Sequence, residues 1–488
     1  MLKQTLLYMP AQLLGPLAMF VAAIVWTHLL DAETYGVVSL VLATQELVYM
    51  LIAWWSLYAL RYRGAVAEER RAKLVAADNT VVLAGSVLQM AVTVPLLTAL
   101  GVRPTMELVA VSMVIFVTRS LLTHYSEVAR TEQAILTYTI AQLSGPFAGT
   151  LASFAGVKLF GGSAVAALVG IAAAQTIGLV WTAIRLRVAI EVRMPDREVL
   201  RDALAYGLPV IFVGVLGWVS TNGIRAIVER MAGAEALGLL SVGWGLGQRV
   251  SSVAAMLLTA AAFPIAVRRF ESGDEEGALH QLAINGAMLF GLLAPTTVGV
   301  TLVADELVPL IIAEPFRAAT IAVLPLAVLA GAVRNQRTHH FDQVFLLNAV
   351  TRRFIPFNII EALGATVGTV VGILMARDSI GALVGATAGA LFGTLLGAAV
   401  TAWFACVDYR LRPLWGTWGR ILLASALMAA VLVPIPWPKS AAGLVTEIVV
   451  GLVVYAAAIV VLIPEVRLLL MARIRKSKAD VETGAESS

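Results

Sequence analysis

Apolar runs of about 20 residues follow one another along the whole chain, with short polar segments between them. A run of this length spans a bilayer as one helix, because the backbone polar groups must be satisfied within the segment itself. We expect fourteen such helices, approximately at 8–30, 36–60, 79–100, 106–124, 136–158, 163–186, 206–229, 237–264, 281–304, 316–347, 353–376, 380–404, 415–435 and 441–463. The pattern therefore predicts an all-α, polytopic membrane protein.

The composition agrees with lipid as the solvent for most of the chain. Hydrophobic residues make up 59% and charged residues only 14%, whereas a soluble domain carries about 25% charged residues. The net charge is +4, but the basic residues lie between apolar runs, so we expect contact with membrane lipid and none with nucleic acid. The single Cys406 excludes an internal disulfide and a cysteine metal site, and we expect no cleaved signal peptide.

The lysines and arginines are distributed unequally between the two sides of the predicted helices. Of the 35, we place 27 on the side of the N-terminus and 7 on the other, with Arg249 in mid-span. Cytoplasmic loops carry the excess of positive charge, so both termini are predicted to be cytoplasmic and the number of spans even.

A short motif occurs twice, with a shift of 202 residues. Ala32, Glu33, Gly36 and Ser39 correspond to Ala234, Glu235, Gly238 and Ser241. Each copy follows one apolar run and opens another, which indicates two parallel repeats, as in two-lobed transporters. The predicted organisation is a six-helix lobe at 1–186, a cytoplasmic linker at 187–205, a second six-helix lobe at 206–404, two further helices at 405–463 and a partly disordered cytoplasmic tail at 464–488.

Several local motifs accompany this span pattern. They are Pro10 to Pro16 (Pro-x-x-x-x-Gly-Pro), Glu33-Thr-Tyr-Gly36, Arg61-Tyr-Arg63, Tyr206-Gly-Leu-Pro209, Asn222-Gly-Ile-Arg225, Ala234-Glu-Ala-Leu-Gly238 and Ala262-Phe-Pro264. Together they resemble the polysaccharide-transporter (Wzx-type flippase) branch of the multidrug/oligosaccharidyl-lipid/polysaccharide exporter superfamily. Many relatives have Asp-Arg where this chain has Ile224-Arg225.

The resemblance implies a transporter and no enzyme. It implies that an isoprenoid-pyrophosphate-linked oligosaccharide is flipped across the bacterial inner membrane by alternating access, for exopolysaccharide or O-antigen (lipopolysaccharide) synthesis. H⁺ or Na⁺ is the expected coupling ion, polysaccharide polymerase or export machinery the expected partner, and no cofactor is expected. The alternatives are a drug/cation antiporter of the same superfamily and, as a weaker candidate, an O-antigen polymerase or ligase, which carries a large outside loop that this chain lacks.

Charged residues inside the spans are the candidate site, because a charge at the bilayer centre costs about 2.5–3.5 kcal/mol on insertion scales and needs a cavity or a partner. Glu46 and Arg249 lie at similar depth in the second and eighth helices, since the 202-residue shift maps Glu46 onto Gln248. One interpretation is a gating or binding pair across a central cavity. The other is that each charge is satisfied within its own lobe.

The tenth predicted helix contains a polar stretch from Arg334 to Gln343. If one helix runs through it, Arg334 and Arg337 share a face that must line water, and two guanidinium groups suit a pyrophosphate or an acidic sugar. The alternative is a cytoplasmic loop. His339 and His340 are adjacent and diverge on a helix, so we expect no metal site.

Further candidates lie on three other helices. Asn222 and Arg225 share a face and are candidate cavity residues, although Arg225 has the alternative of pairing with Glu229. Arg119 is a cavity candidate with the alternative of reaching the cytoplasmic surface. Glu361 is a candidate for gating or coupling, as a proton site or as a satisfied buried acid.

Overall fold

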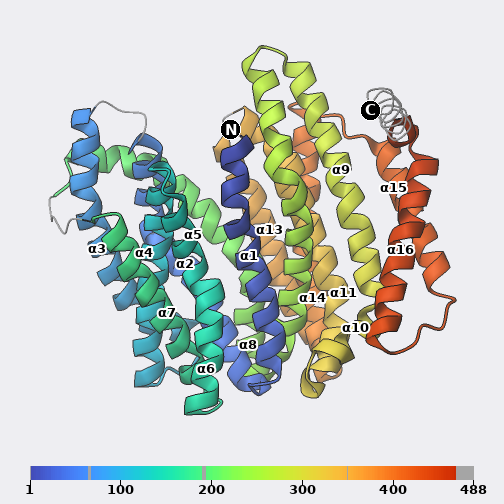
Figure 1. Ribbon diagram of the computed structural model, residues 1–488, viewed down its shortest axis with the longest axis horizontal. Helices are drawn as coiled ribbons and strands as arrows, with labels where there is room; N and C mark the ends of the chain where they lie inside the picture. Colours follow the sequence, from blue (N-terminus) through green and yellow to red (C-terminus); the bar gives the residue numbers. More distant parts are fainter. Residues whose placement is uncertain (1, 64–67, 189–193, 349, 469–488) are drawn as a thin grey trace, which may run out of the picture. The chain divides into compact units, whose positions relative to one another are not determined.

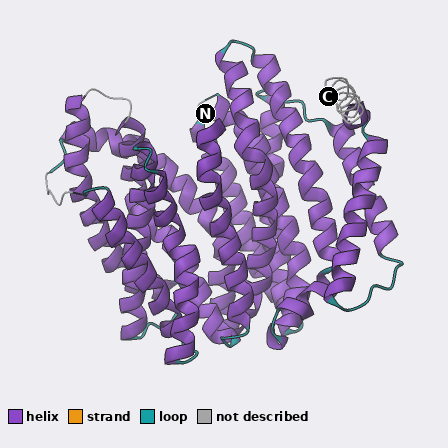
Figure 2. Cartoon of the chain, viewed as in Figure 1, coloured by secondary structure: helices purple, strands orange, loops and turns teal. Residues whose placement is uncertain are grey.

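The computed structural model describes residues 2–63, 68–188, 194–348 and 350–468, and all regular structure in them is helical (Figures 1 and 2). The elements are α1 (Leu2–Thr27), α2 (Ala32–Arg63), α3 (Glu68–Ala99), α4 (Met106–Thr131), α5 (Ile135–Leu143), η1 (Ser144–Gly149), α6 (Thr150–Phe160), α7 (Ala164–Arg185), α8 (Arg197–Glu271), α9 (Glu275–Leu302), α10 (Ala304–Ile311), α11 (Glu314–Gln336), η2 (Arg337–Phe341), α12 (Asp342–Leu347), η3 (Thr351–Arg353), α13 (Phe354–Leu374), α14 (Ser379–Val407), α15 (Trp415–Leu432) and α16 (Ala441–Leu462). Residues 189–193 of the predicted linker and 469–488 of the predicted tail lie outside the described residues.

The predicted fold class is confirmed. Eleven helices of the described chain are long and apolar enough to cross a membrane, and each of the fourteen predicted spans coincides with helical structure. Two of the predicted spans each consist of two helices joined by a π-helical turn. The turn η1 joins α5 and α6, and the turn η2 joins α11 and α12. The short α10 was not predicted as a separate helix.

The 75-residue element α8 contains two of the predicted spans, 206–229 and 237–264, as two helices on either side of a kink. Gly233 forms this kink with a φ of 89°, a left-handed conformation that costs glycine little because it has no Cβ. Just before the break, the Arg230 side chain donates hydrogen bonds to the carbonyl oxygens of Ala99, at 2.8 Å from Nε, and Thr98. These oxygens belong to the last turn of α3, where a positive charge is favourable.

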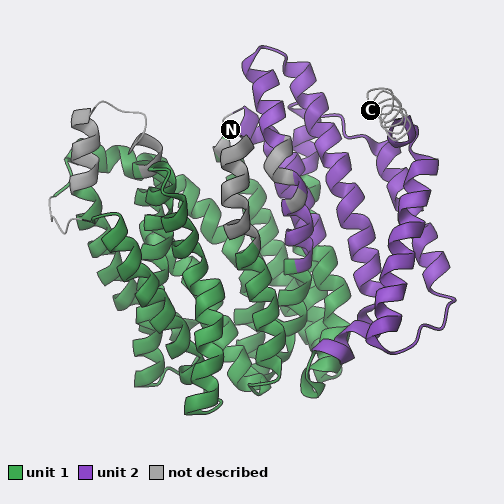
Figure 3. Ribbon diagram, in the orientation of Figure 1, with its two compact units in different colours: residues 1–249, 312–330, 350–400 green, residues 250–311, 331–349, 401–488 purple. Residues whose placement is uncertain are grey.

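The structure consists of two compact units, shown in different colours in Figure 3. Unit 1 comprises residues 1–249, 312–330 and 350–400, and unit 2 comprises residues 250–311, 331–349 and 401–488. Within unit 1, α4 packs against α2, α3, α5 and α7, and α6 packs against α7. The predicted lobe boundaries remain a prediction.

In unit 1 the two copies of the repeated motif pack against each other reciprocally. A Cβ on Gly36 would lie 2.4 Å from the carbonyl oxygen of Ala234, and a Cβ on Gly238 would lie 1.7 Å from that of Ala32. The residue pairs exchange under the 202-residue shift, which is the contact expected of a two-fold relation between repeats. Glycine is required at both positions because no side chain fits there.

The helices α13 and α14 also approach closely, along glycines spaced four residues apart. A Cβ on Gly389 would lie 2.0 Å from the carbonyl oxygen of Gly368, and a Cβ on Gly385 would lie 2.2 Å from that of Gly372. Small residues thus let the two backbones touch, the packing mode of membrane helices.

Unit 2 contains α9, α10, α15 and α16, together with the ends of α8, α11 and α14. The two additional helices predicted from the sequence, α15 and α16, pack against each other and against α9. Trp418 of α15 stacks on Phe290 of α9 with ring centroids 4.4 Å apart, and the Tyr455 hydroxyl of α16 donates to the Gly291 carbonyl oxygen at 2.5 Å.

Candidate substrate site

Four charged side chains in mid-helix positions of unit 1 form one electrostatic group, here called the cation cluster: Glu46 of α2, Arg119 of α4, and Arg225 and Arg249 of α8. The charges of all three arginines act on Glu46. Arg225 and Arg249 also act on each other and on the Tyr35 hydroxyl of α2. Within the cluster, three guanidinium groups face one carboxylate, so positive charge is in excess.

The arginines from the two halves of α8 meet at a glycine. A Cβ on Gly245 would lie 3.1 Å from Nη1 of Arg249 and 3.9 Å from Nη2 of Arg225. Because Gly245 has no side chain, both guanidinium groups fit beside it. Arg225 is 9% exposed and donates from Nη1 to Oδ1 of Asn222, one turn earlier. The Arg225 side chain is therefore hydrogen-bonded to Asn222 rather than paired with Glu229.

The cluster is accessible although its members lie within membrane-spanning helices. Glu46 is exposed, and Arg119 and Arg249 are half-buried. Hydrocarbon does not solvate a charged group, so these side chains face water or a polar ligand rather than lipid. Converging guanidinium groups suit a multiply charged anion, since each offers several donors in a fixed planar geometry.

Arg334 and Arg337 belong to unit 2. The helix runs through the polar stretch as predicted in the first of the two interpretations, but η2 widens it to π-helical geometry. Arg337 is 3% exposed, and its Nε lies 3.4 Å from Oδ1 of Asp342. Arg334 is half-buried. His339 and His340 contribute to no metal-binding group among the described residues.

Glu361 lies in α13 and is 3% exposed. It belongs to unit 1, as the cation cluster does. The structure thus brings Glu46, Arg119, Asn222, Arg225 and Arg249 together, and it buries Glu361 in α13 of the same unit.

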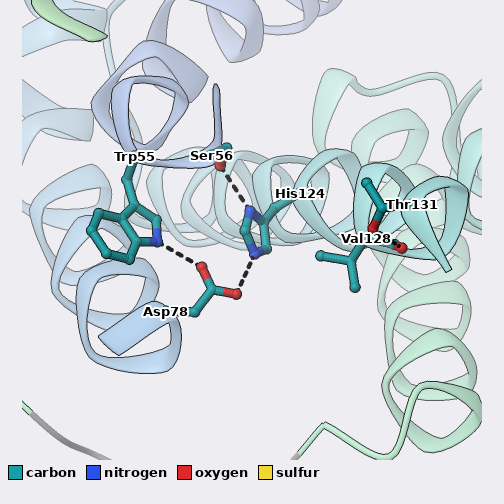
Figure 4. Close-up of polar contacts among 6 residues, drawn as sticks. All are labelled: Trp55, Ser56, Asp78, His124, Val128 and Thr131. Atoms are coloured by element: carbon teal, nitrogen blue, oxygen red, sulfur yellow. Dashed lines mark hydrogen bonds and ion pairs between the residues drawn. The ribbon is translucent and has the colours of Figure 1, made fainter. Parts of the chain in front are cut away.

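The sequence analysis missed two groups of polar residues. Tyr35 and Tyr49 of α2 interact with the arginines of the cluster; a tyrosine carries no insertion cost comparable to a charge, so it gave no signal. Asp78 and His124, which contact each other in the interior (Figure 4), stand at the ends of the predicted spans 79–100 and 106–124, where polar residues are ordinary. The helices extend beyond those ends, which makes both residues interior.

Comparison with known proteins identifies the family. Residues 1–270, more than half of the chain, match the family model described as "Polysaccharide biosynthesis protein". The chain belongs to this family. The resemblance seen in the sequence is thereby confirmed, and no curated protein sequence matches the chain.

Solved structures show which fold this member of the family has. A structure titled "Lipid II flippase MurJ, inward closed conformation" matches with a TM-score of 0.72 at 11% identity, over 94% of this chain and 99% of that one. An inward-facing multidrug resistance MATE family transporter of the MOP superfamily matches with a TM-score of 0.62 at 12% identity, over 81% and 94%. A MOP superfamily transporter from Pyrococcus furiosus, whose title reports a binding pocket of reverse polarity, matches with a TM-score of 0.56 at 16% identity, over 84% and 94%. The fold is thus that of flippases and transporters.

Proposed function

We propose that the chain is a flippase that moves an isoprenoid-pyrophosphate-linked oligosaccharide across the bacterial inner membrane by alternating access, for exopolysaccharide or O-antigen synthesis. The observation that carries the proposal is the cation cluster, an accessible excess of positive charge midway along the helices of a polysaccharide biosynthesis family member. The pyrophosphate links the lipid to the sugar and brings several negative charges to this depth. The solved structure titled a lipid II flippase, which shares the fold, supports the same reaction class.

In this proposal each side chain has a role. Arg225 and Arg249 bind the pyrophosphate beside Gly245, and Asn222 fixes the orientation of Arg225 through its hydrogen bond. Arg119 and Glu46 complete the cluster, and the carboxylate of Glu46 balances part of the positive charge of the arginines when no substrate is bound. In unit 2, Arg334 is a separate candidate for binding an anionic group, whereas Arg337 forms an ion pair with Asp342.

The principal alternative is a drug/cation antiporter, because a multidrug resistance MATE family transporter shares the fold. An excess of guanidinium groups repels a cationic drug, so the cluster favours an anionic substrate. We further propose that both termini are cytoplasmic, that H⁺ or Na⁺ drives transport, that the polysaccharide polymerase or export machinery receives the product, and that the chain catalyses no reaction.

Charge reversal tests the proposal. Arg225→Glu and Arg249→Glu are compared at equal membrane abundance in cells that depend on this chain for polysaccharide export. A charge-assisted hydrogen bond contributes about 1.5–3 kcal/mol, so each variant should lower export at least about tenfold at limiting substrate. Arg377→Glu is the matched control, since Arg377 is exposed in the connection between α13 and α14.

Export at the control level in both cluster variants would contradict the proposal. Export that is unchanged together with altered resistance to cationic drugs would favour the antiporter.

A further inference from the structure

A buried chain of polar side chains joins α2, α3 and α4 within unit 1 (Figure 4). The Trp55 indole Nε1 donates to Oδ1 of Asp78 at 2.6 Å. The second oxygen of this carboxylate, Oδ2, lies 2.9 Å from Nε2 of His124. The other ring nitrogen, Nδ1, lies 2.8 Å from Oγ of Ser56. Trp55, Ser56 and His124 are fully buried, and Asp78 is 6% exposed.

The surroundings of this chain are apolar. A cluster of buried hydrophobic residues from α2, α3 and the start of α8 encloses Trp55. A carboxylate in such a place needs donors, because burial without hydrogen bonds is costly. Trp55 supplies one donor permanently, and His124 supplies the other from Nε2, which leaves Nδ1 of the neutral ring as an acceptor for the Ser56 hydroxyl.

A proton taken up by His124 reverses the direction of the next bond. The imidazolium donates from both nitrogens, so Nδ1 then donates to Oγ of Ser56. The Ser56 hydroxyl must turn its own proton away from His124. Asp78 stabilises the added charge from the other side of the ring.

The Ser56 hydroxyl has a second neighbour that can accept its hydrogen bond. Tyr49, two turns earlier on α2, interacts with the Ser56 side chain. Tyr49 also interacts electrostatically with Arg119, which in turn acts on Glu46. The polar chain therefore runs from Asp78 through His124, Ser56 and Tyr49 to the cation cluster.

We propose that His124, paired with Asp78, is a proton-binding site, and that Ser56 and Tyr49 link its occupancy to the binding of an anion at the cation cluster. With His124 protonated, Ser56 donates to the Tyr49 oxygen, and the Tyr49 hydroxyl is turned toward the cluster, where it donates to an anion. The proton comes from hydronium, whose O–H bond breaks as the N–H bond of the imidazolium forms, and water is released. By reciprocity, the bound anion raises the proton affinity of His124. The identity of the anion as a pyrophosphate rests on the proposed function.

Other ionisable groups surround the site, and each belongs to an element packed on it. Tyr58 lies on α2, Tyr125 lies beside the His124 ring with centroids 5.1 Å apart, and Glu127 of α4 interacts with both His124 and Arg130. Tyr206 of α8 contacts Tyr58. The single charged residue of α7, Arg185, ends that helix and lies over the Trp181 ring. Of these groups Glu127 has a charge that favours the protonated form of His124.

The first test follows the histidine itself. The full-length protein has five histidines, and ¹³C-histidine NMR in lipid nanodiscs resolves their titrations. The signal lost in His124→Gln is assigned to His124; should that variant not fold, the other four histidines are replaced instead. We expect this signal to report a change of protonation at His124 within the pH range in which the protein stays folded. We expect Ser56→Ala to change the proton affinity about fivefold or more, the usual lower range of coupling between sites.

Ser86→Ala is the matched control, because the buried Ser86 hydroxyl donates to the Val82 carbonyl oxygen of its own helix. It should leave the titration of His124 unchanged. The proposal is overturned if His124 keeps one protonation state throughout this range, or if the two serine variants have the same effect.

The second test measures linkage with inorganic pyrophosphate as the probe. Calorimetric titrations in buffers of different ionisation enthalpy give the number of protons taken up on binding. The wild type should take up more protons than His124→Gln, while both bind pyrophosphate. Equal proton uptake in the two proteins would refute the linkage. Absence of pyrophosphate binding would count against the proposed function instead, and the histidine titrations would then decide on the proton site.

Discussion

At the scale of single residues, the charged side chains of the spans are stabilised by one another. Glu46 interacts with Arg119, Arg225 and Arg249, and Asn222 accepts a hydrogen bond from Arg225. A charge without such neighbours would bear the cost of membrane insertion alone. The cluster is therefore a coupled unit, and the effect of one substitution depends on the others.

This coupling predicts the result of a double-mutant cycle on Glu46 and Arg249. Glu46→Gln increases the excess of positive charge in the cluster, and Arg249→Gln removes a guanidinium group proposed to bind the substrate, so each single neutralisation should impair transport. The double variant should recover part of the loss, with an interaction energy of about 0.5–3 kcal/mol. Transport rates at equal membrane abundance measure it.

Strictly additive losses would show that the two residues act separately. The proposed pairing would then be wrong. The proposed flippase function would still be tested separately by the charge-reversal variants.

At the scale of elements, the contact between the repeated motifs sets how closely α2 and α8 pack. Gly238→Ala puts a Cβ 1.7 Å from the Ala32 carbonyl oxygen, which the backbones relieve only by moving apart. Overpacking of this kind costs about 1–3 kcal/mol or more. We expect a lower melting temperature of the purified protein in detergent.

Gly217→Ala is the control for this prediction, because a Cβ there meets no atom within 4 Å and Gly217 lies in the helical part of α8 that precedes Gly233. Alanine in a helix interior is favoured over glycine, so the control should melt at the wild-type temperature or above. Equal melting temperatures for the two variants would mean that the close approach does not limit stability.

At the scale of the whole molecule, the positive charge of the loops predicts the topology. Reporter fusions at Gly484 and in the connection between α2 and α3 should report the cytoplasm. A fusion near Arg377 should report the periplasm, because this connection lies on the side with few basic residues. A periplasmic C-terminus would contradict both the orientation and the even number of spans.

Much of the fold could be predicted from the sequence, because runs of about 20 apolar residues have few structural solutions in lipid. The repeated motif was recognised in the sequence, but the contact of Gly36 and Gly238 with the opposite copy was not predicted. The separation of the spans 206–229 and 237–264 was predicted correctly, since the kink at Gly233 lies between them, but its left-handed geometry was not predicted.

The candidate site could be predicted only where insertion cost singles out a residue. Glu46, Arg225 and Arg249 were found in this way, and they interact in the structure. The pairing of Arg337 with Asp342 was not foreseen, because it depends on the π-helical turn at η2. His124 and Asp78 escaped notice because α3 and α4 extend beyond the apolar runs that marked them.

Translocation in reconstituted vesicles tests the central claim most directly. A fluorescent isoprenoid-pyrophosphate-linked oligosaccharide is incorporated into both leaflets of vesicles that contain the purified protein, and a membrane-impermeant quencher is added outside. We predict that the wild type moves the labelled lipid of the inner leaflet to the outer leaflet, where the quencher reaches it. Arg225→Glu should do so at least about tenfold more slowly. Protein-containing vesicles whose inner-leaflet lipid stays protected, as in vesicles without protein, would contradict it.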